Sequence, residues 1–178
     1  MRMPTDDTGI QVDLVEPVSH FLEAARKALT LEGNVIGDGN KATNFYCIPL
    51  QEFTPQEGRY DVIWIQWCIG QLHDDDFVSF FKQAKAGLKS NGFFVLKENI
   101  ARSGFVLDKD DQSITRSDTY FKELFNRCGL HVYKITDQKG LPEELFAVKM
   151  YALVTDKPTA PNRVRKKTRL NVPAVIKS

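Results

Sequence analysis

An unbroken apolar run near the middle of the sequence constrains the fold more than any other feature. Residues 62–65 read VIWI, with no polar residue between them. A run of this kind is typical of a strand buried on both faces of a parallel sheet. We therefore predict a strand deep in a sheet, with Trp64 in the core.

Polar and aromatic residues follow this strand directly. Gln66, Trp67, Gly70 and Gln71 stand where the strand leaves the sheet. In open α/β sheets the crevice for ligands lies at the carboxyl ends of the strands. We expect a functional site here.

The rest of the chain alternates between strand patterns and helix patterns. The strands are expected at 10–15, 43–50, 93–97, 130–135 and 141–154, and the helices begin at Ser19, Asp74 and Ser117. The second helix should extend to Leu88 and end at residues 90–92. This order predicts an α/β domain with a mostly parallel sheet and an antiparallel last strand.

Residues 98–116 form a connection about twice the usual length. The segment carries its own apolar residues, which can fix it against the domain. We predict an ordered, functional loop, held by Ile100, Phe105, Val106, Leu107 and Ile114.

The composition describes one ordinary domain. The chain has 178 residues and a formal charge of +1, which gives no general attraction to nucleic acid or membrane. No apolar run approaches the ~20 residues of a membrane span. The cysteines, which lack metal-ligand spacing, are expected to be buried free thiols in a reducing compartment: Cys47, Cys68 and Cys128.

We divide the chain into three parts. Residues 1–9 are a polar segment, residues 10–155 are the domain, and residues 156–178 are a flexible basic tail. Five Arg and Lys residues lie between 163 and 169. Solubility explains this tail most simply, and a nuclear-import or nucleic-acid patch is the alternative.

Several segments together carry a family resemblance. They are VDLVEP, YDVIWIQW, KEN followed by GFVLD, SIT, and LPEELFAVKMYAL. Over residues 10–154 the chain resembles the class I S-adenosylmethionine-dependent methyltransferases, and specifically the protein α-N-terminal methyltransferases that act on chains beginning X-Pro-Lys. The resemblance implies a Rossmann-like fold, a monomer in the cytoplasm or nucleus, and no metal.

The resemblance also implies which residues bind S-adenosylmethionine. Glu16 would accept the ribose hydroxyls, although its place also suits a charge at a helix start. Leu50 and Gln51 lie at the adenine position, and Gln66 matches the family's amide beside the cofactor. The full set of expected cofactor residues is Glu16, Pro17, Val18, Leu50, Gln51 and Gln66.

The substrate residues are implied in the same way. An indole suits a proline ring, and Trp67 matches the family's tryptophan. Asp108 and Asp111 match an acidic pair for the lysine, and Asn99 would orient the terminal amine. The expected substrate residues are Trp67, Gln71, Asn99, Asp108, Asp111, Ser113, Leu145 and Phe146.

Asp111 and Asn99 are the residues that we expect to be catalytic. In the family an aspartate and a histidine remove the proton of the amine, but this chain has Gln71 at the histidine position. Either Asp111 acts with a water molecule, or His73 reaches in; we favour the first. Phe146 stands where the family often has a tyrosine.

The family's first strand and its glycine-rich turn have no counterpart in this sequence. That strand lies centrally, between the one ending at Glu16 and the one ending at Gln66. Without it, unpaired backbone groups would face each other. We predict that the two flanking strands either pair directly or stay apart around a void, and that S-adenosylmethionine binds weakly or not at all.

Three functions remain open at this stage. The first is methylation of X-Pro-Lys protein ends. The second is a catalytically silent module that binds the same ends, because the substrate residues are present while the glycine turn is not. The third is a methyltransferase of small molecules, which the acidic loop disfavours.

Overall fold

The computed structural model describes residues 10–30, 41–142 and 144–157. Short 3₁₀ turns lie at Leu50–Glu52, Ile69–Gln71 and Lys85–Gly87. The helices are α1 (Ser19–Thr30), α2 (Asp74–Ala84) and α3 (Asp118–Arg127). The strands are β1 (Gln11–Val15), β2 (Lys41–Tyr46), β3 (Tyr60–Gln66), β4 (Leu88–Ile100), β5 (Phe105–Asp108), β6 (Ser113–Arg116), β7 (His131–Asp137) and β8 (Ala147–Val154).

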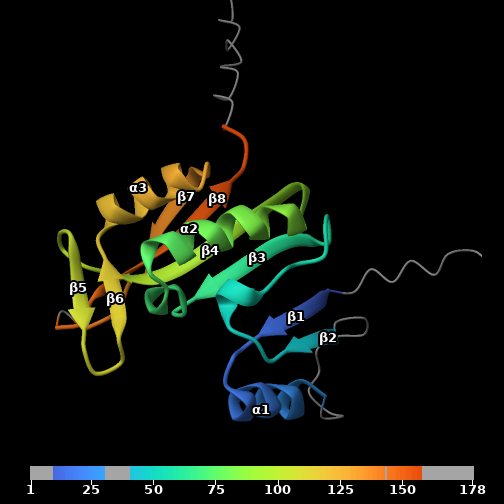
Figure 1. Ribbon diagram of the computed structural model, residues 1–178. Helices are drawn as coiled ribbons and strands as arrows, with labels where there is room; N and C mark the ends of the chain where they lie inside the picture. Colours follow the sequence, from blue (N-terminus) through green and yellow to red (C-terminus); the bar gives the residue numbers. More distant parts are fainter. Residues whose placement is uncertain (1–9, 31–40, 143, 158–178) are drawn as a thin grey trace, which may run out of the picture.

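The main sheet has the strand order β3-β4-β8-β7. Strands β3 and β4 are parallel, and β8 runs antiparallel to both of its neighbours. The predicted α/β class and the antiparallel last strand are therefore confirmed. Strands β1 and β2 form a separate parallel pair on the β3 side of this sheet (Figure 1).

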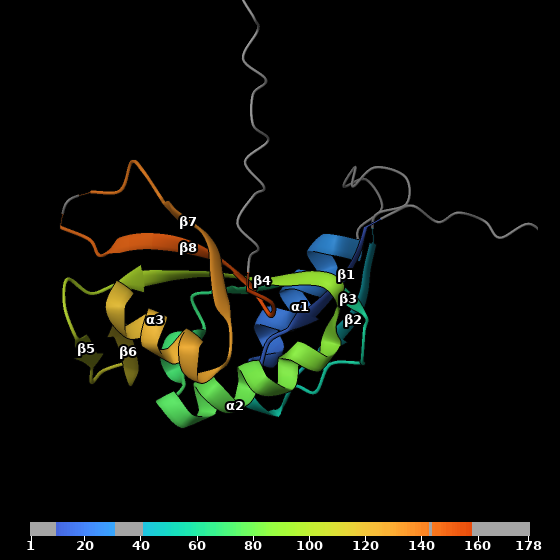
Figure 2. The same cartoon turned by 90° about the horizontal axis from the view of Figure 1, so that it is seen from above.

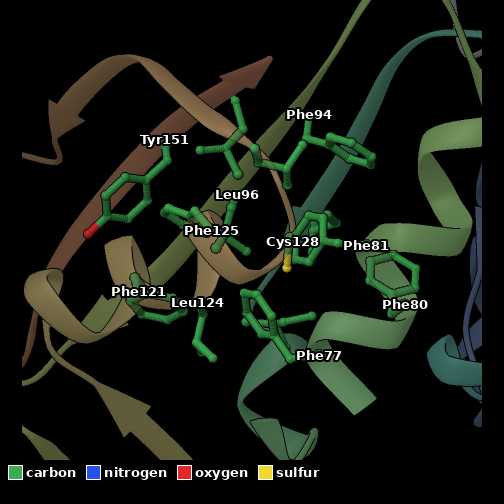
Figure 3. Packing of buried hydrophobic residues seen from close by; sticks show 14 of the residues in the cluster. Phe77, Phe80, Phe81, Phe94, Leu96, Phe121, Leu124, Phe125, Cys128 and Tyr151 are labelled. Atoms are coloured by element: carbon green, nitrogen blue, oxygen red, sulfur yellow. The ribbon is translucent and has the colours of Figure 1, made fainter. Parts of the chain in front are cut away.

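The core lies between the main sheet and helices α2 and α3, which lie side by side on one of its faces (Figure 2). Aromatic side chains of α2 pack against one another and against β4, with ring centroids 4.8 Å apart for Phe77–Phe81 and 5.2 Å apart for Phe81–Phe94. Burying one such side chain stabilises the fold by ~2 kcal/mol or more. Figure 3 shows this cluster, which includes Phe77, Phe80, Phe81, Phe94, Leu96, Phe121, Leu124, Phe125, Cys128 and Tyr151.

The predicted end of the second helix is wrong. Helix α2 ends at Ala84, and strand β4 already begins at Leu88. A Cβ atom at Gly92 would lie 2.8 Å from the carbonyl oxygen of Tyr60. This glycine therefore allows β4 to approach the start of β3, and its role is not to stop a helix.

Strands β1 and β3 stay apart. A cavity of about 800 Å³ lies between them, lined on one side by Val12 and on the other by Val62 and Trp64. Of the two predicted arrangements, the void is the one observed. The expected burial of β3 on both faces is wrong, because Val62 is 40% and Trp64 56% exposed at the edge where no strand of the described residues pairs with β3.

A single carboxylate ties the two sheets together. Asp13 in β1 accepts hydrogen bonds from Arg59 Nε at 2.8 Å and from Tyr60 Oη at 2.8 Å. Asn44 in β2 adds a third donor at 2.9 Å. Burial alone would raise the pKa of Asp13, but these hydrogen bonds outweigh it and hold that pKa below its ordinary value.

The predicted loop of residues 98–116 is ordered, but much of it is a hairpin of β5 and β6. Phe105, Val106 and Leu107 are about half exposed, so the prediction that they fix the segment is wrong for Val106 and Leu107. Phe105 does contact the domain, because its ring centroid lies 6.1 Å from that of Tyr120 in α3. Ile100 is buried as expected. The segment is held mainly by Arg116. The sequence did not indicate this role, because an arginine is usually exposed.

Several further expectations meet the structure only in part. All three cysteines are free, but only Cys128 is buried, because Cys47 and Cys68 lie at exposed ends of strands. Residues 1–9 and nearly all of the basic tail lie outside the described residues. Within the described part of the chain, no helix is long and apolar enough to span a membrane.

Candidate functional site

A cavity of about 410 Å³ lies at the carboxyl ends of β3 and β4. The 3₁₀ turn Ile69–Gln71, strand β6 and the segment before β8 complete its walls. We call this cavity the end pocket. It brings together most of the substrate residues expected from the sequence: Trp67, Gln71, Asn99, Asp111, Ser113, Leu145 and Phe146.

Trp67 enters the end pocket from an unusual backbone conformation. Its φ is +49°, in the left-handed region that costs a non-glycine residue ~1–2 kcal/mol. Its backbone N–H donates to the carbonyl oxygen of Lys97 at 3.1 Å, and the Lys97 Nζ lies 4.4 Å from the ring centroid. Holding this indole half-exposed at the pocket therefore destabilises the fold slightly.

The turn of the β5–β6 hairpin supplies the acidic wall. Asp111 Oδ1 accepts the backbone N–H of Ser113 at 2.9 Å, which fixes the carboxylate beside the pocket. Asp108 Oδ1 similarly accepts the N–H of Asp110 at 2.9 Å, but Asp108 is exposed and does not line the pocket. Of the predicted acidic pair, one member lies in the pocket.

Arg116 fastens the hairpin to the start of α2. The guanidinium is fully buried, and its Nη2 donates to the Leu72 carbonyl oxygen at 2.7 Å and to Asp74 Oδ1 at 2.8 Å. Tyr120 Oη donates to the other oxygen of Asp74 at 2.5 Å. Burial alone would raise the pKa of Asp74, but these two hydrogen bonds hold it below its ordinary value.

Gln71 and His73 lie in different places. Gln71 lines the end pocket from the 3₁₀ turn, while His73 caps α2 in an exposed position outside the pocket lining. Two residues along a turn therefore point elsewhere, as expected. The arrangement favours Asp111 over His73 as a proton acceptor.

Sequence reasoning missed Glu98. This side chain is only 6% exposed and lines the end pocket beside Asn99. Burial raises its pKa to about 7. A signal was available: apolar residues alternate along β4 at 94, 96 and 100, and a carboxyl occupies the same buried face at 98.

The expected cofactor residues do not line the end pocket. Glu16 follows β1, and its Oε1 accepts the backbone N–H of Val18 at 2.8 Å. The Glu16 carboxylate therefore lies beside the start of α1, as the alternative interpretation of this residue expected. Gln66 ends β3, where its Oε1 accepts the Trp64 indole N–H at 3.1 Å. Leu50 borders the 800 Å³ cavity, while Pro17, Val18 and Gln51 are exposed.

The sequence also matches a described family. Residues 6–154 fit the family described as "AdoMet dependent proline di-methyltransferase". The chain belongs to this family. The predicted resemblance is thereby confirmed, and the Rossmann-like class I fold agrees with the structural neighbours.

Members of the family with closely similar sequences include plant and animal proteins. The "Alpha N-terminal protein methyltransferase 1" of Oryza sativa subsp. indica is 68% identical over 168 residues, which cover 94% of this chain and 55% of the rice protein. The "N-terminal Xaa-Pro-Lys N-methyltransferase 1-B" of Xenopus laevis is 39% identical over 80% of this chain and 61% of its own length.

A solved S-adenosylmethionine-dependent methyltransferase from Leishmania major superposes with a TM-score of 0.72 at 40% identity. The superposition covers 81% of this chain and 55% of that one. This chain thus spans about half the length of the relatives that it matches.

The described residues fit only part of the cofactor that the family uses. A carboxylate at Glu16 and an amide at Gln66 suit the ribose and its surroundings. A close backbone approach to the methionine part needs glycine, and residues 10–30 and 41–57 contain none. Among the described residues, no cluster of His, Cys, Asp or Glu could hold a metal ion.

Proposed function

We propose that this chain acts in the transfer of methyl groups from S-adenosylmethionine to the α-amino group of proteins that begin X-Pro-Lys. One observation carries the proposal: an indole, an amide and a carboxylate from three separate segments meet in the end pocket. Membership of the family and the names of its relatives support the same reaction.

The end pocket suits the first residues of such a protein. The half-exposed indole of Trp67 offers an apolar face to a proline ring. Asn99 can accept from the terminal amine and donate to a carbonyl, which fixes the direction of the chain. Asp108, exposed outside the pocket, is placed to meet the lysine ammonium by attraction rather than by enclosure.

The chemistry needs a neutral amine in a fixed position. An N-terminal ammonium has an unperturbed pKa of ~8, so a carboxylate such as Asp111 suffices to take up its proton. Bound S-adenosylmethionine would supply an electrophilic methyl group. The residues of the pocket position the nitrogen and keep its lone pair available.

A second candidate function is a module that binds X-Pro-Lys ends without methylating them. The 800 Å³ cavity beside β3 favours it, because Val15 and Ile65, the residues before Glu16 and Gln66, border an open space there. The end pocket is the same in both functions. The two proposals differ only in whether a bound amine gains a methyl group.

One experiment separates them. The chain is incubated with S-adenosylmethionine and a peptide beginning Ser-Pro-Lys, and mass spectrometry counts the methyl groups on the α-amine, beside a calorimetric peptide titration. Binding with transfer supports the enzyme, and binding alone supports the module. If the peptide neither binds nor gains a methyl group, both proposals are refuted.

Trp67→Ala serves as the site variant, and Trp64→Ala is its matched control outside the pocket. The Trp67 variant should lose peptide binding and the control should keep it. We further propose a monomer in the cytoplasm or nucleus, which a fluorescent fusion and light scattering would test.

A further inference from the structure

The end pocket holds two carboxyl groups in very different surroundings. Asp111 sits on an exposed turn, whereas Glu98 is more than nine-tenths buried at the end of β4. They are the two side chains with carboxyl groups that line this pocket. Paired carboxyls whose environments separate their pKa values are a recurring feature of acid–base sites.

The two carboxyl oxygens of Glu98 differ in their hydrogen bonds. Its Oε1 accepts the backbone N–H of Asn99 at 3.1 Å, and the backbone of Ile69 also hydrogen-bonds the carboxyl. Its Oε2 is sealed from solvent and has no hydrogen-bond partner within the described residues. A buried carboxyl oxygen without a donor is costly, so a fold without another use for it would carry an apolar residue here.

We propose that Glu98 is a second catalytic carboxyl of the site, which takes the proton from the α-ammonium group of the substrate. This inference rests on the function proposed above. In the step, one N–H bond of the ammonium breaks and an O–H bond forms on Glu98. The electron pair of the broken bond stays on nitrogen, and the carboxylate becomes a neutral acid.

The surroundings of Glu98 suit this role. A base works best when its pKa lies near the working pH, and the pKa of Glu98 is about 7. The charged group that acts on its pKa is the Arg116 guanidinium. Arg116 donates to Asp74 and Leu72 through Nε and Nη2, and its buried Nη1 has no hydrogen-bond partner among the described residues. Its positive charge stabilises the Glu98 carboxylate from a distance.

Glu98 can supply the second proton acceptor that the family's histidine position lacks in this chain. The amide at position 71 lines the pocket but cannot accept a proton. Glu98 reaches the same pocket from β4, one residue before Asn99. A carboxyl pair can therefore replace the aspartate and histidine of the family.

The test is the pH dependence of peptide binding. A carboxyl of pKa about 7 is roughly one-tenth ionised at pH 6 and three-quarters ionised at pH 7.5. Calorimetry should show the affinity for a Ser-Pro-Lys peptide rising roughly sixfold over this range, because the ionised carboxyl attracts the ammonium. The roughly eightfold gain in ionised carboxyl is partly offset, since about a quarter of the α-amine, with its pKa of ~8, has lost its proton at pH 7.5. Glu98→Gln should remove the rise, and the exposed Glu123→Gln on α3 should keep it.

The controls separate the two proposals. An N-acetylated peptide has no ammonium, so its weaker binding should not depend on pH. An equal rise in wild type and Glu98→Gln would overturn the role of Glu98 and leave the proposed function standing. Failure of the wild type to bind at any pH would overturn the proposed function and the inference together.

A second measurement does not depend on the variant folding. In wild-type protein labelled with [¹³C]glutamate, the carboxyl signal of Glu98 should titrate near pH 7. Saturating Ser-Pro-Lys peptide should lower that midpoint, because the ammonium stabilises the carboxylate. An unchanged midpoint in the presence of bound peptide would contradict the contact.

Discussion

The ammonium of Lys97 lies over the ring of Trp67, with its Nζ 4.4 Å from the ring centroid. The two residues belong to neighbouring strands, because Trp67 follows β3 and Lys97 lies in β4. The Trp67 N–H also donates to the Lys97 carbonyl oxygen. These contacts help hold the indole in a backbone conformation with a φ of +49°.

Lys97→Met should weaken binding of a Ser-Pro-Lys peptide by about two- to fivefold, because a cation over a half-exposed indole is worth ~0.5–1 kcal/mol. The measurement is a fluorescence titration at ~0.5 M salt, which screens the repulsion between Lys97 and the cationic peptide. Lys89→Met removes an ammonium paired with Asp61 and should have no effect. Equal affinity of wild type and Lys97→Met would contradict this role.

The link between the two sheets makes a prediction about stability. The Asp13 side chain is 3% exposed and accepts hydrogen bonds from three residues, Asn44 in β2, Arg59, and Tyr60 in β3. Asp13→Ala should lower the free energy of unfolding by about 3 kcal/mol, because it removes an enclosed carboxylate and its hydrogen bonds to three residues. Asp61→Ala, which breaks an exposed pair with Lys89, should cost less than ~1 kcal/mol. Urea titrations of both variants test this, and similar losses would refute it.

The same link should be sensitive to acid. The folded-state pKa of Asp13 lies below the ordinary 3.8, so its stabilising effect is present above that value and is lost as the pH falls through the lower folded pKa. Wild type and Asp13→Ala should therefore differ less in urea stability near pH 3 than at pH 7.

Much of the fold could be predicted from the sequence, and the failures have a common cause. Helix faces such as Phe77, Phe81 and Ala84 repeat at helical spacing, and this local pattern is enough to place them. Trp64 was misplaced because its burial depends on a neighbouring strand rather than on its own segment. Periodicity indicates the secondary structure of a segment, but it does not indicate which other segments pack against it.

The candidate site shows the same division. Trp67, Asn99 and Asp111 were predicted from a family pattern, and the structure gathers them in one pocket. Glu98 and Arg116 were missed because their importance lies in burial, and a charged residue within a strand usually indicates an exposed face. Only the three-dimensional packing reveals that both are enclosed.

Glu98 should lower stability at high pH. Burial raises its pKa from 4.5 to about 7. Between these values the folded chain holds a proton that the unfolded chain has released, so its stability falls as the pH rises. One pKa unit corresponds to ~1.4 kcal/mol, so the loss is on the order of 3 kcal/mol.

Glu98→Gln should therefore be more stable than wild type at pH 8, by ~1–3 kcal/mol, and about equal to it at pH 4. Urea titrations at the two pH values measure the difference. A variant that is less stable than wild type at pH 8 would show that the Glu98 carboxylate is a structural partner of Arg116. Such a result would remove the argument that the fold keeps Glu98 for chemistry.

S-adenosylmethionine should bind this 178-residue chain weakly. Glu16 and Gln66 lie near an open cavity, and the described residues on its β1 side include no glycine turn for the methionine part. Calorimetry should give a dissociation constant in the high-micromolar to millimolar range. Sub-micromolar binding would contradict the expectation that the open 800 Å³ cavity weakens the binding of S-adenosylmethionine.

The recognition of a free α-amine followed by proline and lysine is tested most directly by three peptides that share one sequence apart from single changes. The chain is titrated calorimetrically with a Ser-Pro-Lys peptide, its N-acetylated form, and a Ser-Ala-Lys form. The pocket of Trp67, Asn99 and Asp111 predicts that the first peptide binds at least tenfold more tightly than either of the others. Equal affinities for all three, or no binding of the first, would contradict it.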